Sequence, residues 1–301
     1  MKKTNINSMS MSRPAGSRII SIIGSGNVAT HLALALHHAG HIIRQVLSRE
    51  YDHAALLASR VGAQPIDKPS LIDDTAEVFL LAVNDDALYD LALDLRLPSS
   101  LVLHTSGSTP ATVLKSISHR YGVVWSPQTF VRDLAMDYSR LPLCIEGSDA
   151  AVESETEALF SSISNHIYCL DFEQRRWAHL AAVMVNNFGN AINALAQELS
   201  TTHDIDFEML RPLAEMTVKK MDYGPLWPQQ TGPARRHDQK TLDAQRRLLA
   251  DNPKMLQLYD LLTEIIQEKR LLFFLLYIKN HSILKLNPKK IVDCGVLSCA
   301  K

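Results

Sequence analysis

Residues Arg18-Ile-Ile-Ser-Ile-Ile-Gly-Ser-Gly-Asn-Val-Ala29 decide how the chain folds. The apolar, β-branched run from Ile19 to Ile23 predicts a buried strand, and the stretch from Val28 to His38 predicts a helix that follows at once. Between them stands the pattern Gly24-x-Gly26-x-x-Ala29. The sequence therefore predicts a strand, a tight glycine turn and a helix in direct succession.

A glycine turn in this context is suited to a dinucleotide. Gly24 allows the tight turn, Gly26 lets the backbone approach a pyrophosphate, and Ala29 lets the helix pack closely on the strand. The helix N-terminus adds unpaired N–H groups and the positive end of a dipole. The alternative is an ordinary strand–helix turn with two glycines. We expect the pyrophosphate to be held by Gly24, Ser25, Gly26, Asn27 and Val28.

The composition of the 301 residues narrows the class of protein. An apolar fraction of 46% suffices for a sizeable core, and a net charge of −1 argues against a nucleic-acid-binding surface. The four cysteines form no Cys-x-x-Cys pair, so we expect a reducing, cytoplasmic location without a disulfide framework. The longest apolar run, Leu271 to Ile278, is far shorter than the roughly 20 residues that span a bilayer. We also expect no metal site.

Strand and helix signals alternate from residue 18 to about 125, and the strands are almost continuously apolar. Such strands are typical of a parallel sheet covered by helices on both faces, which predicts a doubly wound α/β (Rossmann) domain. Two short strands, Leu143–Glu146 and Ile167–Leu170, are expected to extend the sheet. After about residue 172 only helical patterns follow, at 173–200, 206–222, 238–250 and 253–268.

We therefore predict four segments: a disordered leader (1–17), a dinucleotide-binding domain (18–172), a helical domain (173–268) and a basic tail (269–301). The tail could be a membrane-surface segment, a partner-binding extension or an unselected addition. We expect its role to be peripheral to the active site.

The end of the second strand (42–47) indicates which dinucleotide is bound. An NAD site usually places an acid there, on the ribose 2′-hydroxyl. This chain has Ser48 and Arg49, which suit a 2′-phosphate, although Glu50 follows directly. We predict NADP, with NAD less favoured. Val83 and Asn84, at the end of strand 77–83, are expected to contact the cofactor, whereas Asp85 is expected to cap the next helix.

The strand at 101–104 runs directly into His104-Thr-Ser-Gly-Ser-Thr-Pro110. A nicotinamide site needs polar groups to orient the ring and a proton donor for the product. His104 is a candidate for either task, and Ser106 is a candidate substrate contact. The alternative is a turn whose small residues satisfy the backbone. Thr109 and Pro110 are expected to begin a helix.

The helical pattern at 173–200 carries a second polar group. An apolar face is expected to pack in the core; it consists of Trp177, Leu180, Met184, Phe188, Ala191, Leu195 and Leu199. Asparagine is a poor helix former, so a cluster of asparagines on another face indicates a polar partner. A solvated stripe is the alternative. We assign His179 and Asn187 as candidate catalytic residues and Asn190 as a substrate contact.

A charged loop, Gln230-Thr-Gly-Pro-Ala-Arg-Arg-His-Asp238, precedes the helix at 238–250. Arg235 and Arg236 could bind an anionic substrate or the cofactor phosphates, but a solvated loop explains the charge slightly better from spacing alone. Asp238 is expected to cap the helix that follows.

The stretches IIGSGNVATHLALAL, LHTSGS, SPQTF, HLAAVMVNNFGNAI and QTGPARRHD occur in this order, and together they resemble a bacterial family. Its members are Rossmann-like NADP-binding proteins with a C-terminal helical domain of unknown function. The family is similar to pyrroline-5-carboxylate reductase and to the 6-phosphogluconate and β-hydroxyacid dehydrogenases. The resemblance implies an all-α, 6-phosphogluconate-dehydrogenase-like C-terminal domain that forms a homodimer.

The resemblance further implies an NADP(H)-dependent oxidoreductase whose small-molecule substrate binds between the two domains. By position, His104 and Ser106 match the strand-end motif, and Arg236 and Asp238 match the late loop. Hydroxyacid dehydrogenases place a lysine four residues before the helix asparagine, where this chain has Val183. We therefore expect a reductase of a carbonyl or imine; the alternative is a non-catalytic NADP-binding sensor or scaffold.

Overall fold

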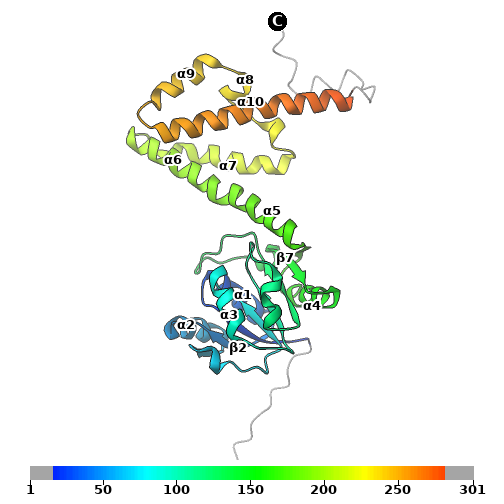
Figure 1. The fold of residues 1–301 in the computed structure, drawn as a ribbon. Helices are drawn as coiled ribbons and strands as arrows, with labels where there is room; N and C mark the ends of the chain where they lie inside the picture. The colour runs from blue at the N-terminus through cyan, green and yellow to red at the C-terminus, as the bar shows by residue number, and fades with distance from the viewer. Residues whose placement is uncertain (1–15, 282–301) are drawn as a thin grey trace, which may run out of the picture. The chain divides into compact units, whose positions relative to one another are not determined.

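The computed structural model describes residues 16–281 (Figure 1). Its strands form one eight-stranded sheet in the order β3-β2-β1-β4-β5-β6-β7-β8. The predicted leader lies almost entirely outside the described residues, as does the tail beyond His281. The strands are β1 (Ile19–Ile23), β2 (Ile42–Leu47), β3 (Gln64–Ile66), β4 (Val78–Leu81), β5 (Leu101–His104), β6 (Arg120–Trp125), β7 (Pro142–Gly147) and β8 (His166–Cys169).

The sheet is parallel from β3 to β6, and β7 then runs antiparallel to β6. The chain leaves β1 toward β2 and β3, and then returns to place β4 on the other side of β1. The strand order therefore reverses between β1 and β4, which is where open α/β sheets bind ligands. The predicted doubly wound domain is confirmed.

Helices cover both faces of the sheet. One face packs against α1 (Asn27–His38), α2 (Tyr51–Val61) and α4 (Ala150–Phe160). The other packs against α3 (Asp85–Asp94) and the short 3₁₀ helix Ala111–Ser116. Ile22 of β1 points into the first core and Ile23 into the second, as expected for a strand that is apolar on both sides.

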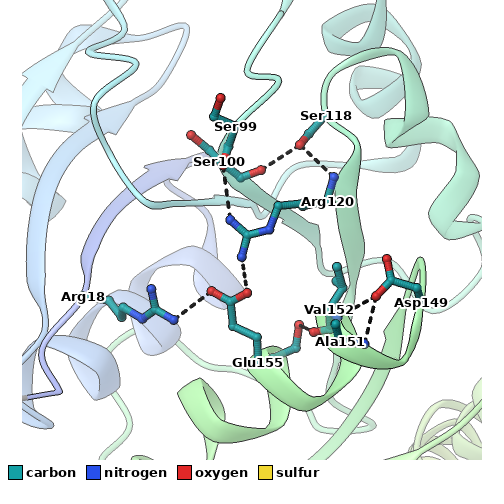
Figure 2. A network of polar contacts seen from close by, with 10 residues as sticks. Arg18, Ser99, Ser100, Ser118, Arg120, Asp149, Ala151, Val152 and Glu155 are labelled. Atoms are coloured by element: carbon teal, nitrogen blue, oxygen red, sulfur yellow. Dashed lines mark hydrogen bonds and ion pairs between the residues drawn. The ribbon is translucent and has the colours of Figure 1, made fainter.

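A polar cluster around Glu155 of α4 lies where β1 and β6 begin (Figure 2). The Glu155 carboxylate on α4 accepts hydrogen bonds from Arg18, at 2.7 Å, and from Arg120, at the start of β6. Arg120 also donates to the carbonyl of Ser99 at 3.2 Å, and its backbone N–H donates to Ser118 Oγ at 3.0 Å. The cluster ties α4 to the ends of β1 and β6.

The remaining elements are helical. They are α5 (Phe172–Ala182), a π-helical turn (Val183–Phe188), α6 (Gly189–Thr202), α7 (Arg211–Lys219), α8 (Pro233–Arg236), α9 (Gln239–Leu248) and α10 (Pro253–His281). The predicted helix at 173–200 is thus present as one helical stretch, whose middle at 183–188 adopts the wider π-helical pattern. Helix α10 also continues past the predicted end at 268. No helix among the described residues has both the length and the apolar character that crossing a membrane requires.

The contacts divide the chain into two units after Ala194, within α6. The predicted domain boundary after residue 172 stays a prediction.

Within the first unit, the predicted core face of the 173–200 helix is exposed rather than buried. Trp177 is 69% exposed, and Leu180, Met184 and Phe188 are also exposed. A helical period identifies a face that avoids water, but it does not say whether the same chain covers that face.

Candidate functional site

A pocket of about 590 Å³ lies at the carboxyl ends of β1, β2 and β4. This volume is within the range of roughly 300–1,000 Å³ that is typical of small-molecule and cofactor sites. The glycine turn forms one wall, the loop after β2 a second and the loop after β4 a third. All nine residues predicted to bind the cofactor line it: Gly24, Ser25, Gly26, Asn27, Val28, Ser48, Arg49, Val83 and Asn84.

The two glycines of the turn are needed for different reasons. Gly24 has a φ of +116°, and a Cβ there would lie 2.2 Å from the carbonyl oxygen of Ala82. Gly26 comes directly before α1, and a Cβ there would meet no atom within 4 Å. Gly24 is therefore required by the fold, whereas Gly26 leaves the space in front of the helix N-terminus open. This open space fits a bound pyrophosphate.

The wall after β2 carries the groups expected to recognise a 2′-phosphate. Ser25 Oγ donates to Ser48 Oγ at 2.9 Å, which joins this loop to the glycine turn. Arg49 is exposed and lines the pocket. Among the described residues, no carboxylate forms an ion pair with it. Glu50 lies 3.5 Å from His53 on α2. The pocket also contains acids, Asp67 and Asp90, so its charge is mixed.

The cap of α3 is Asn84, whose Oδ1 accepts a hydrogen bond from the N–H of Ala87 at 3.2 Å. The prediction that Asp85 caps this helix is wrong, because Asp85 is already its first residue. The Asp85 carboxylate instead accepts a hydrogen bond from Ser108 Oγ. Burial by itself would raise the pKa of Asp85, but hydrogen bonds from Ser108, Ser106 and Thr109 lower it below its usual value. Asp85 therefore anchors the loop after β5.

His104 is completely buried at the end of β5. Its Nδ1 accepts a hydrogen bond from the N–H of Ser106 at 3.1 Å, which fixes the start of the loop. Burial, together with the nearby charge of Arg175, lowers the pKa of His104 to about 4. The ring is neutral at neutral pH and has no surface exposed to a substrate. The placement favours a role in holding the loop, and the catalytic role of His104 stays a prediction.

The hydroxyl of Ser106 also serves the loop. Ser106 Oγ accepts hydrogen bonds from the N–H groups of Ser108 at 3.2 Å and Thr109 at 3.0 Å. The prediction that Thr109 begins the next helix is wrong. The 3₁₀ helix starts at Ala111, and Pro110 stands directly before it. Thr105 lines the pocket and was missed, although its place directly after β5 is a signal that could have found it.

A buried arginine on α5 also holds the loop after β5. Arg175 on α5 is 1% exposed; it pairs with Glu146 on β7 and donates to the carbonyl oxygen of Thr109 at 2.6 Å. Neither Arg175 nor Glu146 was predicted as a site residue. An arginine in an amphipathic helix gives no sequence signal that its guanidinium is buried.

His179, one turn further along α5, lies over the loop. Its ring meets Trp125 edge-on, with the ring centroids 5.6 Å apart. A Cβ on Gly107 would come within 3.0 Å of both rings, so this glycine is what allows the close approach. His179 is only half-buried, unlike His104. The structure therefore brings the predicted His179 together with the His104–Pro110 loop.

Other predicted residues are not brought to this loop within their units. Asn187 in the π-helical turn and Asn190 in α6 are exposed. Arg236 is exposed at the end of α8, in the second unit. Asp238 caps α9, as expected, by accepting hydrogen bonds from the N–H and hydroxyl of Thr241. The catalytic role of Asn187 and the substrate-binding roles of Asn190, Arg236 and Asp238 stay predictions.

Both parts of the chain match known protein families. Residues 19–106 match the family described as NADP oxidoreductase, coenzyme F420-dependent, and residues 141–266 match a domain of unknown function, DUF2520. No curated protein matches the sequence.

Solved structures of similar proteins cover most of the chain. A Bacteroides fragilis protein described as an NADP oxidoreductase is 35% identical, with a TM-score of 0.77, over 84% of this chain and 98% of its own. A Thermotoga maritima protein is 22% identical, with a TM-score of 0.67, over 83% of this chain and 97% of its own.

A reductive aminase from Aspergillus terreus, solved with NADPH and ethyl-5-oxohexanoate, has the same fold at 18% identity and a TM-score of 0.65. It covers 84% of this chain and 95% of its own. The resemblance read from the sequence is confirmed: the chain belongs to the family of Rossmann-type NADP oxidoreductases that carry a C-terminal DUF2520 domain.

Proposed function

We propose that this protein is an NADPH-dependent reductase of a small carbonyl or imine compound. The observation that carries the proposal is the pocket at the point where the strand order reverses, with the Gly24–Val28 turn on one wall and Arg49 on another. The bound cofactor would supply the hydride. The chain's own residues would bind its phosphates, orient the substrate and hold a proton for the product.

The residues around Arg49 favour NADP over NAD as the cofactor. A 2′-phosphate needs a cation and hydroxyl donors, and Arg49 and Ser48 provide both. Glu50 lies beside His53, whose imidazole lies 3.5 Å away. A carboxylate held there is less available to accept a hydrogen bond from a ribose hydroxyl, which is how NAD sites select their cofactor.

Removing the Arg49 guanidinium should abolish the preference for NADPH. We expect Arg49→Ala to raise the Kd for NADPH about tenfold, the effect of losing one charge-assisted hydrogen bond, and to leave the Kd for NADH unchanged. Isothermal titration of the wild type and of Arg49→Ala, each with NADPH and with NADH, measures the four dissociation constants. An equal loss for NADPH and NADH would contradict the assignment of the 2′-phosphate loop, and binding of neither by the wild type would exclude the proposed function.

The proton donor we propose is His179. Unlike His104 it is half-exposed, and it lies over the loop that continues from the pocket residue Thr105. An imidazole that solvent reaches can act as a general acid and be reprotonated from water.

Replacing His179 should therefore slow turnover without weakening cofactor binding. We expect His179→Asn to lower kcat by about 10²–10⁴-fold, the usual contribution of a general acid, with an unchanged Kd for NADPH. Oxidation of NADPH, followed by its absorbance, is measured against a panel of imines and keto acids. An absence of turnover with the whole panel, despite tight NADPH binding, would favour the non-catalytic sensor.

We also propose that the protein is a homodimer formed through its helical part. Leu213 and Met216 lie on α7 and Met209 in the 3₁₀ turn directly before it; the three recur at helical spacing, and Leu213 is 66% exposed. Exposed apolar faces of this kind mark interfaces between proteins. Light scattering of the purified protein should give twice the mass of one chain, and Leu213→Asp should return it to one chain mass. A monomeric wild type would contradict the proposal.

A further inference from the structure

We infer that Arg132 is an additional cofactor-binding residue, directed at the pyrophosphate of the dinucleotide. The inference rests on the proposed cofactor and extends the site to a segment that is remote in sequence. Arg132 lies in the long connection between β6 and β7, more than a hundred residues after the glycine turn.

The connection is fastened to the glycine turn and to α1 by several independent contacts. Asn27 Nδ2 donates to the carbonyl of Phe130 at 2.9 Å, and His31 Nε2 lies 2.8 Å from the carbonyl of Val131. The second nitrogen of His31, Nδ1, lies 3.0 Å from the hydroxyl of Tyr138. Phe130 is buried in the core cluster that contains α1. Residues 130–138 are thus held against the N-terminal half of α1.

This anchoring places the guanidinium of Arg132 at the turn itself. Arg132 Nη2 donates to the carbonyl oxygen of Ser25, the middle residue of Gly24-Ser25-Gly26, at 3.2 Å. A guanidinium has five N–H donors, and the bond to Ser25 uses one. Among the described residues no carboxylate forms an ion pair with Arg132. A positive charge with spare donors is therefore held beside the backbone that faces a doubly charged pyrophosphate.

A pyrophosphate is the group that this charge suits best. The N–H groups at the start of α1 supply only partial charges, so the full positive charge of Arg132 at the turn would complete the neutralisation. The 2′-phosphate has its own candidate in Arg49, on another wall of the pocket. Because NADPH and NADH share the pyrophosphate and differ in the 2′-phosphate, the two arginines predict different patterns of binding.

The test measures the Kd of NADPH and of NADH for the apo-protein by titration calorimetry. We expect Arg132→Ala to weaken both nucleotides by the same factor, about tenfold, and to leave the ratio of the two constants as in the wild type. Arg49→Ala should instead change the ratio. The matched control is Arg140→Ala, which removes the same charge from an exposed position near the end of the same connection and should change neither constant.

Two further variants separate the charge from the folding of the connection. Arg132→Lys keeps a positive charge and should recover part of the affinity, whereas Arg132→Gln keeps a hydrogen-bond donor and should not. Arg132 has no role at the pyrophosphate if Arg132→Ala binds both nucleotides like the wild type, if only NADPH is weakened, or if Lys and Gln behave alike. Failure of the wild type to bind either nucleotide would instead remove the proposed function itself.

Discussion

Gly24→Ala is expected to destabilise the N-terminal unit by about 3 kcal/mol or more, because two costs act at one position. The new Cβ would lie 2.2 Å from the carbonyl oxygen of Ala82 and 2.8 Å from its carbon, so β1 and β4 must move apart. The backbone φ of +116° is also strained for any residue with a side chain. Thermal unfolding followed by circular dichroism measures the loss, at about 2–4 °C for each kcal/mol in a unit of this size.

Substitutions at two other glycines separate the cost of the steric clash from the cost of the strained backbone. Gly62 has a φ of +66°, but a Cβ there would meet nothing within 4 Å, so Gly62→Ala should show the backbone cost alone, about 1 kcal/mol. Gly26→Ala carries neither cost and should unfold like the wild type, yet it should weaken NADPH by filling the space in front of α1. A Gly24→Ala protein no less stable than Gly62→Ala would contradict the close approach of β1 and β4.

The order strand, turn and helix at the start of the domain could be predicted because every signal that specifies it is local. The β-branched run Ile19–Ile23 favours a buried strand, and the φ of +116° at Gly24 needs glycine whatever surrounds the turn. The cap at the start of α3 shows the limit of this reasoning. Asn84 and Asp85 are both good N-caps, and the strand length that decides between them is set by pairing with its neighbours.

The apolar face beginning at Trp177 shows a second limit. Its periodicity is real, but Trp177, Met184 and Phe188 are exposed, because a helical period does not say what covers the apolar face. The π-helical turn at 183–188 was not foreseeable either, because residue propensities do not distinguish a π turn from an α turn. Such turns occur frequently at functional sites, and this one contains Asn187.

The sequence alone could not single out Arg175, because the adjacent Arg176 is the same residue type in nearly the same local sequence. One residue rotates the helix by about 100°, which turns Arg175 toward β7 and Arg176 toward water. Only the pairing of β7 with β6 places Glu146 under α5. The difference between the two arginines is therefore a tertiary effect, and it allows a closely matched experiment.

Arg175→Met is expected to destabilise the N-terminal unit by about 3 kcal/mol, the low end for breaking one side of a buried ion pair, since the Glu146 side chain is itself 21% exposed. The thermal midpoint should fall by about 6–12 °C. The loss leaves the Glu146 carboxylate without its partner and the carbonyl of Thr109 without the donor now 2.6 Å away. The loop that begins at the pocket residue Thr105 should loosen, so NADPH affinity should fall as well.

Arg176→Met is the control. Both guanidinium carbons lie near the ring of Phe172, at 5.4 Å for Arg175 and 5.6 Å for Arg176, so the contact with the aromatic ring is matched. Arg176 pairs with Glu173 on the exposed surface, where such a pair contributes at most about 0.5 kcal/mol. In Arg175→Met, a second change of Glu146→Gln removes the orphaned charge and should restore part of the lost stability. Equal midpoints for Arg175→Met and Arg176→Met would mean that the buried pair does not hold α5 to the sheet.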